Sequence, residues 1–142
     1  MTNTSTAMRH IFVDTGAFLG RYLLGDQHHA QALDLWDKVE RESESCFTSN
    51  FVLDETFTFL ARHSTYSYAA EKARSIYSSS AFLILRPDLE VELAAIRLFE
   101  KFADQEVSFT DCVSFVLMRQ SRIRTAFAFD RHFEHAGFKL WK

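Results

Sequence analysis

Short apolar runs alternate with longer segments of helical periodicity along this chain. Short runs that are rich in aromatic and branched side chains and bounded by polar residues are typical of buried strands. They predict strands at His10–Val13, Cys46–Thr48, Phe82–Leu85 and Thr125–Phe129, with Phe138–Leu140 as a candidate for a last strand.

Apolar residues in the intervening segments recur every three or four positions, as they do on one face of a helix. We expect helices from Ala17 to about Gly25 and at His28–Glu42, Phe51–Arg62, Tyr66–Tyr77 and Asp88–Phe102, a helix that starts after Ser108, and a short turn or helix at His132–Ala136. The Asp88–Phe102 helix carries Leu89, Leu93, Ile96 and Phe99 on its apolar side, and Ala103–Glu106 is expected to form a polar loop. The alternation, without tight hairpin signals, predicts an α/β fold with a mainly parallel sheet covered on both faces.

The composition narrows the class of protein. A chain of 142 residues suits a single domain spanning 1–142, in which about two-thirds of the unfolded surface is buried. Residues 1–8 are a candidate for a disordered leader, and Met8 is an alternative start. A net charge of -3 provides no global attraction to nucleic acid or to anionic membranes. No membrane-spanning run or secretory signal is evident, so we expect a cytoplasmic protein with reduced Cys46 and Cys112.

Three aspartates occupy related positions in this pattern. Asp14 follows the first predicted strand, Asp111 lies at the start of a helix, and Asp130 follows the strand after that helix. A helix of roughly 14 residues covers about 21 Å, and a strand of five residues returns about 17 Å. Asp111 and Asp130 are therefore expected at one edge of the sheet, together with Asp14. Open α/β sheets bind their ligands beyond the carboxyl ends of the strands.

Each acid also has a structural explanation. Asp14 suits the N-cap of the following helix, and Asp111 suits a helix start, where the dipole stabilises negative charge. Asp130 suits a turn. A fourth acid comes from the helix that Asn50 is expected to cap, where Asp54 and Glu55 lie about 100° apart around the axis. Apolar residues nearly encircle this helix, so periodicity does not choose between Asp54 and Glu55.

Carboxylates that converge at one edge need a cation or raised pKa values, because two charges 4 Å apart repel by about 4 kcal/mol at a dielectric of 20. Oxygen ligands favour Mg²⁺ or Mn²⁺, which in enzymes support the hydrolysis of phosphodiesters. His132 and His135 lack a companion cysteine pair and do not predict a zinc site. We expect His28 and His29 to be surface residues of a first helical turn.

Four motifs in this order resemble the PIN-domain nucleases, in particular the VapC-type toxin ribonucleases. They are FVDTGAFLGRY with Asp14, TSNFVLDETFTFL with Glu55, SFTDCVSFVLMRQ with Asp111 and TAFAFDRHFEHAGF with Asp130, and they span nearly the whole chain. The resemblance implies a PIN-like three-layer sandwich with a sheet of about five strands. It selects Glu55 over Asp54 and adds Thr110 as a hydroxyl that supports the site.

The resemblance also implies an activity. RNA is the expected substrate, and the expected cofactor is Mg²⁺ or Mn²⁺, held by Asp14 and Asp111 and, directly or through water, by Glu55 and Asp130. Arg131 and Arg21 are candidates for binding the RNA backbone. Toxin members of the family form homodimers and bind an antitoxin whose C-terminal segment covers the active site. We expect self-association through the aromatic segments Phe51–Leu60 and Tyr66–Tyr77.

Other α/β proteins with an acid after the first strand fit less well. Dehalogenase-like phosphatases need a second aspartate where Gly16 stands, and receiver domains need paired acids and a late lysine. The chain has no phosphate-binding loop of the GxxxxGK[ST] type. The main alternative is a catalytically inactive PIN-like module that binds RNA or protein. The presence of all four acids favours the nuclease.

Overall fold

The structure, a computed structural model, describes residues 9–42 and 44–142, so the expectations for the leader at 1–8 lie outside the described residues. The strands are β1 (His10–Val13), β2 (Ser45–Ser49), β3 (Phe82–Leu85), β4 (Thr125–Phe127) and β5 (Lys139–Leu140). The helices are α1 (Thr15–Tyr22), α2 (His29–Arg41), α3 (Asn50–His63), α4 (Tyr66–Ser78), α5 (Leu89–Lys101), the 3₁₀ helix η2 (Ala103–Gln105), α6 (Phe109–Gln120) and α7 (His132–His135).

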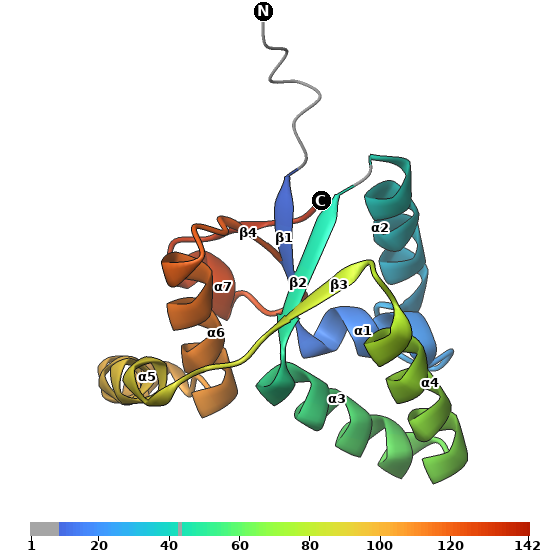
Figure 1. Cartoon of the computed structure of the whole chain (residues 1–142), viewed down its shortest axis with the longest axis horizontal. Coiled ribbons are helices and arrows are strands. Elements are labelled where there is room, and N and C mark those ends of the chain that lie inside the picture. The colour runs from blue at the N-terminus through green and yellow to red at the C-terminus, as the bar shows by residue number, and fades with distance from the viewer. Residues whose placement is uncertain (1–8, 43) are drawn as a thin grey trace, which may run out of the picture.

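The five strands form one parallel sheet in the order β3-β2-β1-β4-β5. Helices α1 to α4 lie on one side of this sheet, and α5, α6 and α7 lie on the other (Figure 1). This arrangement confirms the predicted α/β sandwich. The chain moves outward from β1 to β2 and β3 and then crosses to β4 on the other side of β1. The carboxyl ends of β1 and β4 therefore flank the point at which the strand order reverses, where doubly wound sheets bind ligands.

Aromatic side chains fill the space between the layers. Phe12 and Phe127 on neighbouring strands are fully buried, as are Phe18 on α1 and Phe115 on α6. The indole of Trp36 on α2 donates a 3.0 Å hydrogen bond to the carbonyl of Ala17, so its one polar atom is satisfied within the core. These contacts fix the helices that carry the acids to the sheet.

Some predicted boundaries are wrong by one or two residues. Strand β4 ends at Phe127 rather than Phe129, because its last partner, Val13, is where β1 ends and the chain turns into α1. Ser49 caps α3 in place of Asn50, with its Oγ accepting a 3.1 Å hydrogen bond from the Val52 amide. The expected polar loop at Ala103–Glu106 contains η2.

The apolar side of α5 faces away from the core. Leu89, Leu93, Ile96 and Phe99 are 46% to 67% exposed, whereas Val91 and Ala95 are buried. Helix α5 packs mainly against α6, and its apolar surface extends beyond that contact. None of the helices in the described ranges is both long and apolar enough to cross a membrane.

Candidate active site

Four carboxylates line one pocket of about 500 Å³ beyond the carboxyl ends of β1 and β4. Asp14, Glu55, Asp111 and Asp130 all contribute to its wall. They come from the end of β1, from α3, from the first turn of α6 and from the segment after β4. The structure therefore brings together the four acids that the sequence placed at one edge of the sheet. Asp54 is exposed on α3 and is not part of the pocket wall.

Asp14 is the most buried member of the group. It occupies the N-cap position of α1, but its side chain makes no capping hydrogen bond. Among the described residues, the buried Oδ1 of Asp14 has no hydrogen-bond partner. Burial, together with the negative charge of Asp111, raises the pKa of Asp14 well above its usual value. A capping role alone does not account for a carboxylate held in this environment.

Glu55 reaches the pocket from the second turn of α3. Its Oε1 accepts a 2.6 Å hydrogen bond from the hydroxyl of Thr15, the first residue of α1. This contact connects α1 to α3 at the pocket and fixes the direction of a long, exposed side chain. The hydroxyl that contacts this acid of the pocket is that of Thr15. Thr110, which was expected in this role, is half-buried and is not part of the pocket wall.

Asp111 lies in the first turn of α6 but does not cap it. Ser108 is the N-cap, and its Oγ accepts a 3.0 Å hydrogen bond from the Asp111 amide. The carboxylate is thereby free to face the pocket. Burial and the charge of Asp130 raise the pKa of Asp111 to about 6, although the nearby His132 opposes this shift.

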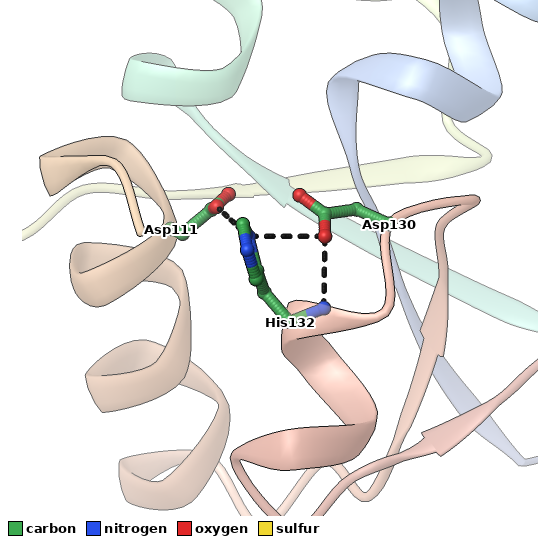
Figure 2. A group of neighbouring side chains, drawn as sticks. All are labelled: Asp111, Asp130 and His132. Carbon is green, nitrogen blue, oxygen red and sulfur yellow. Dashed lines mark hydrogen bonds and ion pairs between the residues drawn. The ribbon is translucent and has the colours of Figure 1, made fainter. Parts of the chain in front are cut away.

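Asp130 and His132 form the wall on the β4 side. Oδ1 of Asp130 accepts a 2.8 Å hydrogen bond from the His132 amide, so Asp130 is a turn residue as well as a pocket residue. The ring of His132 lies between the carboxylates of Asp111 and Asp130 (Figure 2). The sequence pattern gave no reason to place His132 here. The one signal in the sequence is that His132 follows Asp130 by two residues, the spacing at which its amide can donate to the aspartate in a turn.

The donor set fits a divalent cation. Two of the four carboxyls, Asp14 and Asp111, have raised pKa values because they are buried beside other negative charges. A bound cation would offset this repulsion and would provide a partner for Oδ1 of Asp14. The ligands are mostly oxygen atoms, which Mg²⁺ and Mn²⁺ accept.

Aromatic rings border the pocket. His28 stacks on Phe129 with ring centroids 4.3 Å apart and an interplanar angle of 4°, and both residues line the pocket. His28, which was expected to be a surface residue of a first helical turn, is half-buried at the N-cap of α2, beside the segment after β4. Phe59, which is 40% exposed on α3, lines the same pocket.

The two arginines predicted to bind substrate are placed differently. Arg131 is exposed and follows Asp130 directly in the chain, but it is not part of the pocket wall. The guanidinium of Arg21 lies 4.7 Å from the ring centroid of Trp36, and Arg21 lines a separate cavity. Arg21 is half-buried there, because its place on α1 directs it toward α2 rather than toward the acids. A role in binding RNA at this pocket is therefore not supported for Arg21.

Sequence comparisons identify related proteins. Residues 11–139 match the PIN domain family model. The chain is 35% identical over 128 residues to the 23S rRNA-specific endonuclease VapC20 of Mycobacterium tuberculosis, covering 90% of this chain and 95% of that protein. It is 30% identical over 135 residues to the VapC ribonuclease of Archaeoglobus fulgidus, covering 92% of this chain and 84% of the relative.

Solved structures agree in fold. The crystal structure of M. tuberculosis VapC20, described as a toxin that cleaves the sarcin-ricin loop, superposes with a TM-score of 0.81 at 34% identity and covers 90% of this chain and 95% of that chain. FitAcB from Neisseria gonorrhoeae shares the fold, with a TM-score of 0.67 at 17% identity over 93% of this chain and 96% of its own. The match to the family model and the two VapC relatives show that this chain belongs to the PIN-domain family.

Proposed function

We propose that this protein is a metal-dependent endoribonuclease that hydrolyses RNA phosphodiester bonds at the acidic pocket, and that it acts as the toxin of a toxin–antitoxin pair. The observation that carries the proposal is the convergence of four carboxylates around the buried, unpartnered Oδ1 of Asp14 within the described residues. Relatives that cover most of this chain are named as ribonucleases.

The proposed metal is Mg²⁺ or Mn²⁺, with Asp14 and Asp111 as direct ligands and with Glu55 and Asp130 binding directly or through water. When bound, such an ion lowers the pKa of a coordinated water and stabilises charge on the phosphate. The residues of the chain provide the rest. Thr15 orients Glu55, Ser108 caps the first turn of α6, which carries Asp111, and the exposed Arg131, the residue after Asp130, attracts the RNA backbone.

The rim of the pocket suits single-stranded or splayed RNA. The stacked pair His28–Phe129 and the partly exposed Phe59 offer ring faces or edges beside the acids. Unpaired bases commonly stack on such side chains, and loops are the usual targets of sequence-selective RNA recognition. We therefore propose loops of structured RNA as the substrate class.

Two protein partners belong to the same proposal. The first is an antitoxin that covers the acidic pocket, and the second is another copy of this chain. The aromatic segments on α3 and α4 leave Phe59, Tyr66 and Tyr77 partly exposed, but α5 exposes a longer stripe of aliphatic and aromatic residues. We propose α5 as the main dimer contact because this stripe is continuous and lacks the hydroxyl groups of the tyrosines.

We also propose a cytoplasmic location, because both cysteines are free and buried.

The experiment is cleavage of a panel of RNA hairpins, including a sarcin–ricin loop hairpin, by purified protein. EDTA is expected to stop cleavage, and excess Mg²⁺ or Mn²⁺ is expected to restore it. Attack by water leaves a 5′-phosphate and a 3′-hydroxyl, and a single 2′-deoxy substitution at the cut site is tolerated. Products with 2′,3′-cyclic phosphates, or cleavage that survives EDTA, would indicate a different mechanism. A protein that binds neither metal would be an inactive PIN-like module.

A further inference from the structure

The histidine at the start of α7 lies beside two carboxylates of the acidic pocket. Nδ1 of His132 is 3.0 Å from Oδ1 of Asp130 and 3.4 Å from Oδ2 of Asp111 (Figure 2). One potential ligand atom from each of these three residues lies within 4.8 Å of the other two. Ligands that bind one cation at about 2.1 Å are roughly 3 Å or more apart. The three atoms therefore have the spacing of a partial coordination shell.

Independent evidence for a ligand comes from an unpartnered atom of the same pocket. Oδ1 of Asp14, whose residue is 6% exposed, has no hydrogen-bond partner within the described residues. A buried polar atom without a partner is costly, because it has lost its hydrogen bonds to water and gains none in the protein. Nδ1 of His132 makes no hydrogen bond of good geometry there, and its contacts are the ion pairs with Asp111 and Asp130. A cation bound in this pocket would give Oδ1 of Asp14 a compensating charge.

The ring of His132 is held in place by the fold. The amide of His132 donates to Oδ1 of Asp130, which closes the turn before α7. The next residue, Phe133, is fully buried and packs edge-on against Phe115 of α6, with ring centroids 5.1 Å apart. This contact joins α7 to the helix that carries Asp111. His135, one turn later, is exposed and lies outside the cluster.

We propose that His132 is a nitrogen ligand of the metal ion and that it shifts the preference of the site from Mg²⁺ toward transition metals such as Mn²⁺ and Co²⁺. The proposal rests on the proposed function, since it concerns the same metal. Mg²⁺ prefers oxygen ligands and loses its water reluctantly, whereas imidazole binds first-row transition metals more strongly. Asp111 and Asp130 supply oxygen atoms, and His132 adds the softer donor.

The test measures metal binding directly, without RNA. Electron spin echo modulation of Mn²⁺ bound to the full chain is expected to show coupling to ¹⁴N, and labelling the histidines with ¹⁵N is expected to remove it. His132→Gln is expected to abolish the ¹⁴N coupling, and the matched variant His135→Gln is expected to retain it. By calorimetry, His132→Gln should weaken Co²⁺ and Mn²⁺ binding by about tenfold or more, and Mg²⁺ binding by much less.

The outcomes separate this inference from the proposed function. If Mn²⁺ binds without ¹⁴N coupling, or if His132→Gln weakens all three metals equally, His132 is only a countercharge and the inference is wrong while the nuclease proposal stands. If the chain binds none of the metals, both are wrong. Circular dichroism checks the folding of the variant. If the variant does not fold, the ¹⁵N-histidine experiment on the unsubstituted protein still decides whether a histidine binds the metal.

Discussion

The hydroxyl of Thr15 donates a 2.6 Å hydrogen bond to Oε1 of Glu55, which joins the first residue of α1 to the second turn of α3. This contact orients an exposed glutamate toward three other carboxylates. Thr15→Val keeps the shape of the side chain but removes the donor. A hydrogen bond to a charged group contributes about 1.5–3 kcal/mol, and an exposed one contributes toward the low end.

We therefore expect Thr15→Val to lower kcat/KM for RNA cleavage by about tenfold and to lower the free energy of unfolding by about 1.5 kcal/mol or less. Steady-state kinetics and urea denaturation measure the two effects. Thr58→Val, an exposed position on α3 that is not part of the pocket wall, is the matched control. A Thr15→Val enzyme with the activity of the control would show that the contact does not position Glu55.

The pKa of Asp111 predicts how stability depends on pH. Burial and the charge of Asp130 raise this pKa from 3.8 to about 6 in the folded protein. The folded state therefore binds a proton that the unfolded state lacks between these values, so the metal-free protein should lose stability as pH rises from about 4 to about 6, and Asp111 should cause no further loss at higher pH. In EDTA, Asp111→Asn should be more stable than the unsubstituted protein at pH 8, and this difference should shrink as pH falls below 6.

Urea denaturation of both proteins between pH 4 and pH 8 measures this difference. Subtraction removes the contribution of groups that do not interact with Asp111, whereas Asp14, whose pKa the charge of Asp111 raises, remains part of the difference. Saturating Mn²⁺ should reverse the order at pH 8, because the metal stabilises only the protein that keeps the carboxylate. A difference that stays constant with pH would contradict the proposed protonation of Asp111.

Arg131 should affect RNA binding more than the chemical step. It is exposed beside Asp130, so Arg131→Ala removes one phosphate contact. We expect KM to rise several-fold, kcat to change little, and the slope of log K against log salt concentration to fall by about 1. Arg97→Ala on α5 is the control at an exposed position outside the acidic pocket. An equal effect of both variants would mean that only net charge matters.

Self-association should depend on α5. Ile96→Glu places a charge in the exposed apolar stripe, where Ile96 is 46% exposed. We expect this variant to sediment as a monomer at concentrations where the unsubstituted protein is a dimer. Leu24→Glu, at a residue that is 85% exposed outside α5, controls for added charge. Dissociation by Tyr66→Glu instead would place the contact on α4, as the sequence pattern suggested.

The sequence predicted where the acids lie, because their positions depend on where strands end and helices begin. Asp14, Asp111 and Asp130 each lie next to such a boundary, so an error of one or two residues in β4 did not move Asp130 away from the pocket. Periodicity could not choose Glu55, because α3 carries apolar residues on nearly every side. The positions of His132, Thr15 and Arg21 were missed because they depend on side-chain directions and on contacts between distant segments.

The sequence also could not predict how much of the apolar face of α5 is buried. An amphipathic pattern indicates which face of a helix is apolar, but it does not say how much of that face a neighbouring helix covers. Here α5 packs mainly against α6, Val91 and Ala95 are buried, and Leu93 and Ile96 are half-exposed.

Single-turnover cleavage of a responsive RNA hairpin by Asp14→Asn tests whether RNA is hydrolysed by a metal ion at the acidic pocket. Asparagine keeps the shape of the buried side chain but removes its charge, so the fold should persist and the metal-free protein should become somewhat more stable. We expect Asp14→Asn to lower the cleavage rate by at least about 10²-fold. We also expect EDTA to abolish cleavage by the unsubstituted protein. If Asp14→Asn cleaved RNA at the rate of the unsubstituted protein, and if this cleavage persisted in EDTA, the result would contradict the proposed mechanism.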